Sequence, residues 1–162
     1  MDNKNNSMKK FVSLATLLFF GIVAYAQSNY CIEQGRKISV VITQEINSQK
    51  DFGTHLAEIV GDVYDESGEV VLIKKGTPVY IQVRCRRANV TGNVGEITIT
   101  PISTLAYNDR EITFDAEPIV FTGNENAVFR SQMKAVVAKG TAFIAPIANT
   151  YCFNLQPQVT VE

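Results

Sequence analysis

The sequence has a single histidine and almost no net charge, and each shortage excludes a class of function. The lone histidine, His55, leaves no His-rich metal site and no choice of general base for nucleophilic catalysis. With 15 basic and 16 acidic residues, the chain has no overall attraction to nucleic acid or anionic lipid. Phosphate-binding glycine loops, nucleophile elbows and zinc helices are also missing from the sequence. We therefore expect a protein that is not an enzyme, with no cofactor, no metal and no nucleic-acid partner; a hydrolase is the least favoured alternative.

Long hydrophobic runs are scarce as well, and the longest one lies near the start of the chain. Lys9 and Lys10 precede an apolar run over 11–23, and Ala24-Tyr25-Ala26 follows it. This order is typical of a secretory signal peptide that is cleaved after Ala26. Its about 13 residues fall short of the roughly 20 that span a bilayer, although a membrane anchor is the alternative. We expect a periplasmic, outer-membrane-associated or secreted protein with no transmembrane segment after processing.

The remainder has the length of one domain. We divide the chain into a signal peptide over 1–26, a lead over 27–35, a domain over 36–155 and a tail over 156–162. Removal of Asp2, Lys4, Lys9 and Lys10 leaves 12 basic (15 minus 3) and 15 acidic (16 minus 1) residues.

Apolar and polar residues alternate through most of the domain, with Gly, Pro and Asn between the alternating segments. This pattern predicts an all-β fold, a small antiparallel barrel or sandwich. Gly68 follows three polar residues and predicts a hairpin turn at 65–68. Residues 124–138 break the alternation and predict one short helix or ordered excursion. The expected strands are 37–43, 55–64, 69–74, 79–86, 96–100, 111–114, 142–144 and 150–155.

The three cysteines have different surroundings in the sequence. Cys85 shares the apolar face of 79–86, which predicts a buried free thiol. Cys31 and Cys152 lie near the two ends of the predicted domain, and such ends often meet, so we predict a disulfide between them. Three free thiols are the alternative. A catalytic cysteine is disfavoured because His55 is the sole histidine.

Several turn motifs are similar to those of a known family: Ile38-Ser39-Val40-Val41-Ile42 leading to Ile46-Asn47-Ser48, Gly61-Asp62-Val63-Tyr64-Asp65, Gly68, Leu72-Ile73-Lys74-Lys75-Gly76-Thr77-Pro78-Val79, Asn108-Asp109-Arg110-Glu111-Ile112-Thr113-Phe114 and Pro146-Ile147-Ala148-Asn149-Thr150-Tyr151-Cys152. On these motifs the chain resembles the C-terminal β-barrel of the TrbI-type scaffold proteins of conjugation and type IV secretion machines. Two departures matter: Lys74-Lys75 stands where that family has proline, and the inner-membrane helix and proline-rich spacer of the full scaffold are absent. Asn149 replaces a glycine of the family's closing motif, a mild change because Asn tolerates positive φ. The resemblance implies a barrel and a scaffolding role, but not a role that spans two membranes.

The best candidate contact surface is the polar face of 79–86. Guanidinium groups in a row bind phosphates or carboxylates of a glycan, a lipid headgroup or a protein. The alternative is a charged outer face that only keeps an edge strand soluble. The candidate residues are Tyr80, Gln82, Arg84, Arg86 and Arg87.

Two weaker candidates remain. The acids of 62–69 suggest a calcium loop, but their spacing does not match one, so we expect a solvated hairpin tip. His55 is interpreted as a polar residue at the edge of a strand, and Asn89-Val90-Thr91 as a glycosylation sequon.

Together these observations favour a binding or scaffolding module of the bacterial cell envelope. The alternative is a protein that binds an anionic ligand through its arginine strand. The expected partner is an envelope protein or an anionic surface polymer, and a homo-oligomer is possible.

Overall fold

The computed structural model describes residues 29–89, 92–126 and 133–154. The predicted signal peptide, the tail, and Val90 and Thr91 of the sequon lie outside these residues. Asn29–Phe153 form one compact unit.

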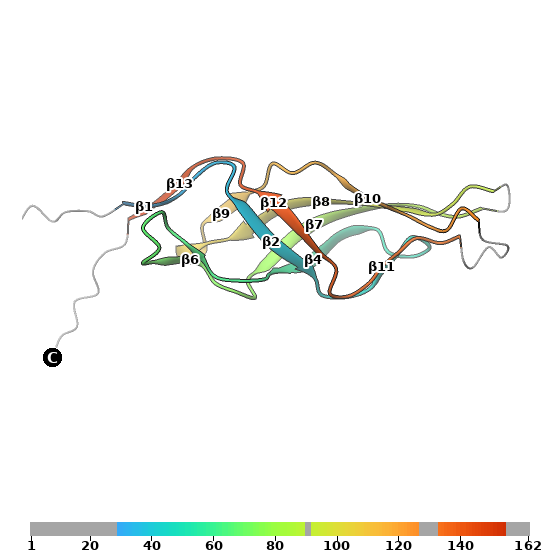
Figure 1. The fold of residues 1–162 in the computed structure, drawn as a ribbon, viewed down its shortest axis with the longest axis horizontal. Coiled ribbons are helices and arrows are strands. Elements are labelled where there is room, and N and C mark those ends of the chain that lie inside the picture. The colour runs from blue at the N-terminus through green and yellow to red at the C-terminus, as the bar shows by residue number, and fades with distance from the viewer. Residues whose placement is uncertain (1–28, 90–91, 127–132, 155–162) are drawn as a thin grey trace, which may run out of the picture. The chain divides into compact units, whose positions relative to one another are not determined.

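The unit is built from antiparallel strands, which confirms the predicted all-β class (Figure 1). The main sheet has the order β10-β8-β7-β4-β2-β12, and β9 pairs with the far end of β8. The strands are β1 (Asn29–Ile32), β2 (Lys37–Ile42), β3 (Ile46–Asn47), β4 (Gly53–Ile59), β5 (Val63–Tyr64), β6 (Val71–Ile73), β7 (Pro78–Arg86), β8 (Glu96–Leu105), β9 (Glu111–Thr113), β10 (Ile119–Thr122), β11 (Val136–Val137), β12 (Ala142–Pro146) and β13 (Tyr151–Asn154).

The sheet curls into a half-barrel whose two sides meet at one short contact. Just beyond β9 and β12, Phe114 and Ile147 form an isolated antiparallel bridge. The Asp115 N–H donates to the Pro146 carbonyl at 2.9 Å, and the Ala148 N–H donates to the Thr113 carbonyl at 3.0 Å. Past this contact β10 and β12 do not pair with each other, so the sheet has two edges. Of the two predicted architectures, this is an incomplete barrel rather than a sandwich.

Period-two alternation fills the inside of the sheet with branched apolar side chains. In β7, Val79, Ile81 and Val83 are buried while Tyr80 and Arg84 are exposed. Burial of each such side chain stabilises the fold by about 1.5–3 kcal/mol, which makes this inner row the main source of stability. The largest fully buried side chains are Ile32, Val40, Ile42, Ile46, Ile59, Leu72, Ile73, Ile81, Ile97, Ile99, Ile112 and Ile147.

Three two-stranded pairs flank the main sheet. β5 and β6 form the predicted hairpin, in which Gly68 has φ +77°. β11 pairs with β3, and β1 pairs with β13. The β1–β13 pair carries the predicted Cys31–Cys152 disulfide, which joins residues 121 positions apart.

The segment 124–138 differs from its predicted helix where the structure describes it. Val136 and Val137 form β11, because their backbone pairs with Asn47 and Ile46 of β3. Residues 127–132 of the predicted helix lie outside the described residues. A 3-10 turn occurs instead at Tyr107–Asp109, where Asn108 and Asp109 have φ of 58° and 56°.

Candidate binding face

β7 is a central strand, paired with β4 on one side and β8 on the other. The alternative for its polar face assumed an edge strand, and the central position of β7 contradicts that assumption. Alternation places four of the predicted residues in one outward row, with Gln82 half-buried and the other three exposed: Tyr80, Gln82, Arg84 and Arg86.

The arginines of this row have different electrostatic surroundings. The Arg86 Nη2 lies 2.9 Å from the Glu96 Oε2, and both side chains are at the surface. No carboxylate of the described residues lies within ion-pair distance of Arg84 or Arg87. Arg87 is exposed just past the end of β7. Arg84 is therefore the cation of the strand that is free to meet a partner's charge.

Two exposed apolar residues lie beside the row on the β4 side. Leu56 pairs with Tyr80 across the strands, and both side chains are exposed. Phe52 directly precedes Gly53, the first residue of β4, which pairs with Val83 of β7. Phe52 is 71% exposed, the most exposed large apolar residue that the structure describes.

We call the set Phe52, Leu56, Tyr80, Gln82, Arg84 and Arg86 the arginine face. On its β8 side, Thr98 pairs with Arg84 and Thr100 with Gln82. Aromatic residues and arginine are the residue types most enriched in protein-binding hot spots. The composition suits contact with another protein.

Cys85, on the inner side of the same strand, is a free thiol as predicted. It is half-buried rather than buried, because it lies near the end of β7. Its Sγ–H donates to the Asp51 carbonyl at 2.6 Å. Burial, and to a smaller extent the charge of Asp51, raises the pKa of the Cys85 thiol, which opposes a role as a nucleophile.

The predicted hairpin tip uses one of its acids internally. The Asp65 Oδ1 accepts the backbone N–H groups of Glu69 (3.1 Å) and Val70 (2.9 Å), and the Oδ2 accepts from Ser67. These hydrogen bonds, that of the Ser67 hydroxyl above all, lower the pKa of Asp65 from 3.8 to about 2. Within the described residues, no three His, Cys, Asp or Glu side chains gather as a metal site would require.

His55 is the third residue of β4, which lies in the middle of the main sheet. Its Nδ1 is 3.1 Å from the Gln44 amide nitrogen, an interaction between two side chains of neighbouring segments.

Among the comparisons with known proteins, only the one with solved structures gives a match. No family model and no curated protein matches the chain. Among solved structures, the chain is similar to ComB10 of the Com type IV secretion system of Helicobacter pylori, with 14% identity, a TM-score of 0.48, and coverage of 80% of this chain and 93% of that chain. That neighbour belongs to the class of machine that the turn motifs resemble; so distant a similarity assigns neither a family nor an activity.

The described residues contain no helix long and apolar enough to cross a membrane.

Proposed function

We propose that this protein is an exported, non-enzymatic binding or scaffolding module of the bacterial envelope, and that it contacts a partner protein through the arginine face. The observation that carries the proposal is the outward row of β7, in which Tyr80, paired with the exposed Leu56, shares a face with Arg84, a cation with no carboxylate within ion-pair distance in the described structure. Exposed apolar residues next to an unpaired guanidinium favour a partner with both apolar and acidic groups.

The disulfide supports the proposed location. Disulfides persist in the periplasm and outside the cell but are rare in the reducing cytoplasm. The Cys31–Cys152 bond therefore fits a chain that is exported by the leader predicted over 1–26. A scaffolding role in a conjugation or secretion machine is the finer form of the proposal, and it comes from the turn motifs alone.

The test measures retention of envelope proteins on the immobilised protein and on three variants. Arg84→Ser and Phe52→Ser alter the arginine face, and Lys139→Ser removes an exposed cation elsewhere. We expect the first two to lower retention of the same partner at least fivefold, and Lys139→Ser to leave it unchanged. Arg84→Ser should also flatten the salt dependence, because an exposed charge acts through a screened field.

The outcomes separate the candidate functions. Retained secretion components would support the scaffold, whereas arginine-dependent retention of an anionic polymer would support the ligand-binding alternative. Equal retention by all variants would show that the arginine face has no partner and would overturn the proposal.

A further inference from the structure

The edge of β12 is an unprotected strand edge on the open side of the half-barrel. The bonds Ile42 N–H to Thr141 O (2.9 Å) and Ile147 N–H to Arg36 O (3.0 Å) show that odd-numbered residues of 141–147 hydrogen-bond to β2. Even-numbered residues therefore direct their backbone groups away from β2. The Pro146 carbonyl does so and accepts from Asp115, but no described residue hydrogen-bonds to the outward backbone groups of Ala142 or Ile144.

Two prolines explain why the pairing between the two sides of the half-barrel does not continue past the Phe114–Ile147 bridge. The bridge between Phe114 and Ile147 sets a register in which Asp115 faces Pro146, and Glu117 would next face Ile144. Pro146 has no N–H to return the bond from Asp115, and Pro118 follows Glu117 directly. The barrel therefore stops closing at this point, and the edge of β12 stays open.

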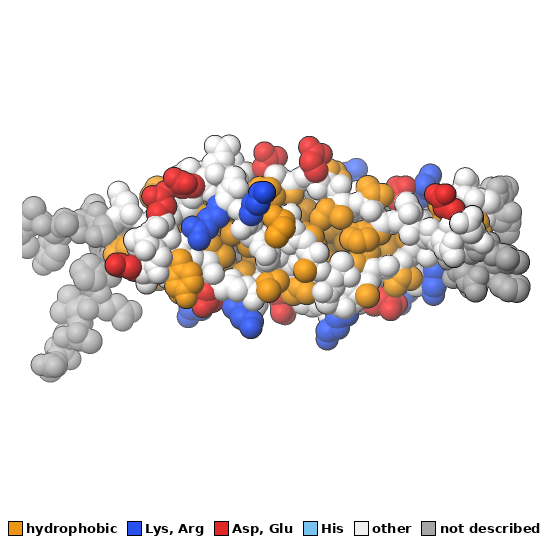
Figure 2. All heavy atoms as spheres, in the orientation of Figure 1, with side chains coloured by type: hydrophobic (Ala, Val, Ile, Leu, Met, Phe, Trp, Pro, Cys, Tyr) orange, Lys and Arg blue, Asp and Glu red, His pale blue; other side chains and the backbone are white. Residues whose placement is uncertain are grey.

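The open edge is apolar where natural edges are usually charged. Strand β12 reads Ala-Phe-Ile-Ala-Pro, with no charged residue, and Ile144 is 49% exposed. On the opposite edge, Val120 of β10 is 54% exposed. Hydrophobic side chains gather over β12 and β2 in the middle of the face that Figure 2 shows. Natural proteins protect edges with charges, bulges or short strands, so this edge is suited to pairing with another strand.

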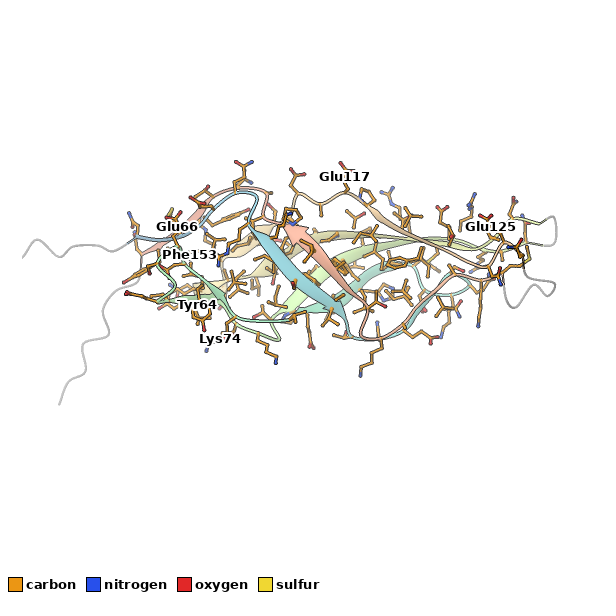
Figure 3. The ribbon with its side chains drawn as sticks, viewed as in Figure 1. Tyr64, Glu66, Lys74, Glu117, Glu125 and Phe153 are labelled. Atoms are coloured by element: carbon orange, nitrogen blue, oxygen red, sulfur yellow. A yellow bond between two sulfur atoms is a disulfide. The ribbon has the colours of Figure 1, made fainter. Side chains whose placement is uncertain are left out.

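Acidic residues border the same edge, and their charge indicates which kind of strand would bind there. Asp115 and Glu117 are exposed on the segment that leaves the closing bridge, and Figure 3 shows the Glu117 side chain pointing outward from that segment. Residues 114–126 contain three acids and no Lys or Arg. A second copy would bring the same acids together, and the tail over 156–162 carries Glu162 as its only charged side chain. A second copy and the tail would therefore both bring negative charge close to these acids, which disfavours their binding at this edge.

We propose that β12 binds a partner protein by strand addition, taking an extended segment with alternating apolar side chains and flanking Lys or Arg residues. The main-chain groups of Ala142 and Ile144 pair with the added strand, and the acids Asp115 and Glu117 attract its basic flanks. The site is separate from the arginine face, so its test is independent of the proposed function.

Amide hydrogen exchange on the full chain tests the pairing at single residues. The probe is a ten-residue synthetic peptide of alternating Thr and Val with Lys at each end; its control has Glu at each end. Without peptide, the amides of Phe143 and Ala145 should exchange slowly and those of Ala142 and Ile144 quickly. With the Lys peptide, Ala142 and Ile144 should exchange at least tenfold more slowly, and the Glu peptide should have a much smaller effect.

Variants then test the edge itself. Ile144→Pro removes an outward N–H and leaves the bonds to β2 in place, as Pro146 already does at the same parity. Ile144→Lys adds a repelling charge, and Ser39→Lys is its matched control, because Ser39 pairs with Ile144 but lies on a strand paired on both sides. We expect both Ile144 variants to abolish peptide protection and Ser39→Lys to retain it.

Four results would overturn the proposal. The first is absence of protection at millimolar Lys peptide, and the second is unchanged binding by Ile144→Pro. The third is protection of Ala142 and Ile144 in the free monomer that disappears when the chain is cut after Asn154, which would assign the edge to the protein's own tail. The fourth is protection that rises with protein concentration alongside dimer formation in sedimentation, which would assign it to a second copy.

Discussion

Asp65 shows how one carboxylate can specify a turn. Its oxygens accept hydrogen bonds from the backbone of Ser67, Glu69 and Val70, so the hairpin between β5 and β6 depends on an ionised side chain. An acid turn of this kind resembles a metal loop in sequence. In the structure the carboxylate oxygens are already occupied by N–H donors, which is why the residue contributes to folding rather than to ligand binding.

The lowered pKa of Asp65 makes a pH-dependent prediction. Because the pKa falls from 3.8 to about 2 on folding, the stabilisation is fully present above about pH 4 and disappears as the pH falls towards 2. Asp65→Asn should lower the thermal midpoint at pH 7 and weaken the decline of stability between pH 4 and 2. Thermal unfolding followed by circular dichroism measures both, with Glu69→Gln of the same turn as the control. An unchanged acid decline in Asp65→Asn would show that the turn does not depend on the charge.

The strands that the sequence predicts best are those whose own residues alternate. β2, β7 and β8 carry an inner row of Ile or Val and an outer polar row, so their type and exposed face were predictable. β3 and β11 have two residues each and exist because they pair with each other across the chain. No local pattern predicts such a pairing.

The same reasoning applies to the candidate site. Alternation in one strand predicts the row from Tyr80 to Arg86, because it needs no knowledge of other strands. Leu56 was missed because only the register of β4 against β7 pairs it with Tyr80. Phe52 was missed because its signal in the sequence, an aromatic residue directly before Gly53, is too weak to predict a binding residue.

Close approach between elements explains Gly123 and gives a second prediction. A Cβ on Gly123 would overlap the carbonyl oxygen of Met133, where the chain enters β11. Gly123→Ala should therefore destabilise the protein by about 2 kcal/mol or more, through forced backbone shifts. Gly61→Ala is the control, because its added Cβ meets nothing within 4 Å and its φ is not positive; it should be neutral or slightly stabilising. Urea unfolding compares the two, and equal effects would contradict the crowding at Gly123.

At the scale of the whole domain, the last strand, β13, is held by several different contacts. The disulfide joins β1 to β13. The Arg110 guanidinium lies 5.5 Å from the ring centre of Tyr151 and 5.4 Å from that of Phe153, and it donates to the Cys152 carbonyl. The Tyr151 hydroxyl lies 2.8 Å from that of Thr113. β13 therefore has contacts that survive without the disulfide.

Loss of the disulfide gives the third prediction. A covalent link across 121 positions restricts the unfolded chain and stabilises the fold by up to about 5 kcal/mol. The double variant Cys31→Ser, Cys152→Ser should lose much of this stability in guanidinium unfolding, yet keep its sheet, because Arg110 and Tyr151 still hold β13. Hydrogen exchange should rise first in β1. A variant as stable as the natural protein would show that the unfolded chain is already restricted without the bond.

The Cys31–Cys152 bond also determines how the domain responds to mechanical force. The two Cα atoms lie 4.1 Å apart, so tension applied to the chain before Cys31 and after Cys152 passes through the sulfur atoms and bypasses the sheet. With the bond intact, pulling lengthens the chain between the two cysteines very little. With the bond reduced, the 121 intervening positions can extend by roughly 400 Å, at about 3.3–3.6 Å per residue. The oxidised domain is therefore a fixed-length link under load, and a reductant turns it into an extensible one.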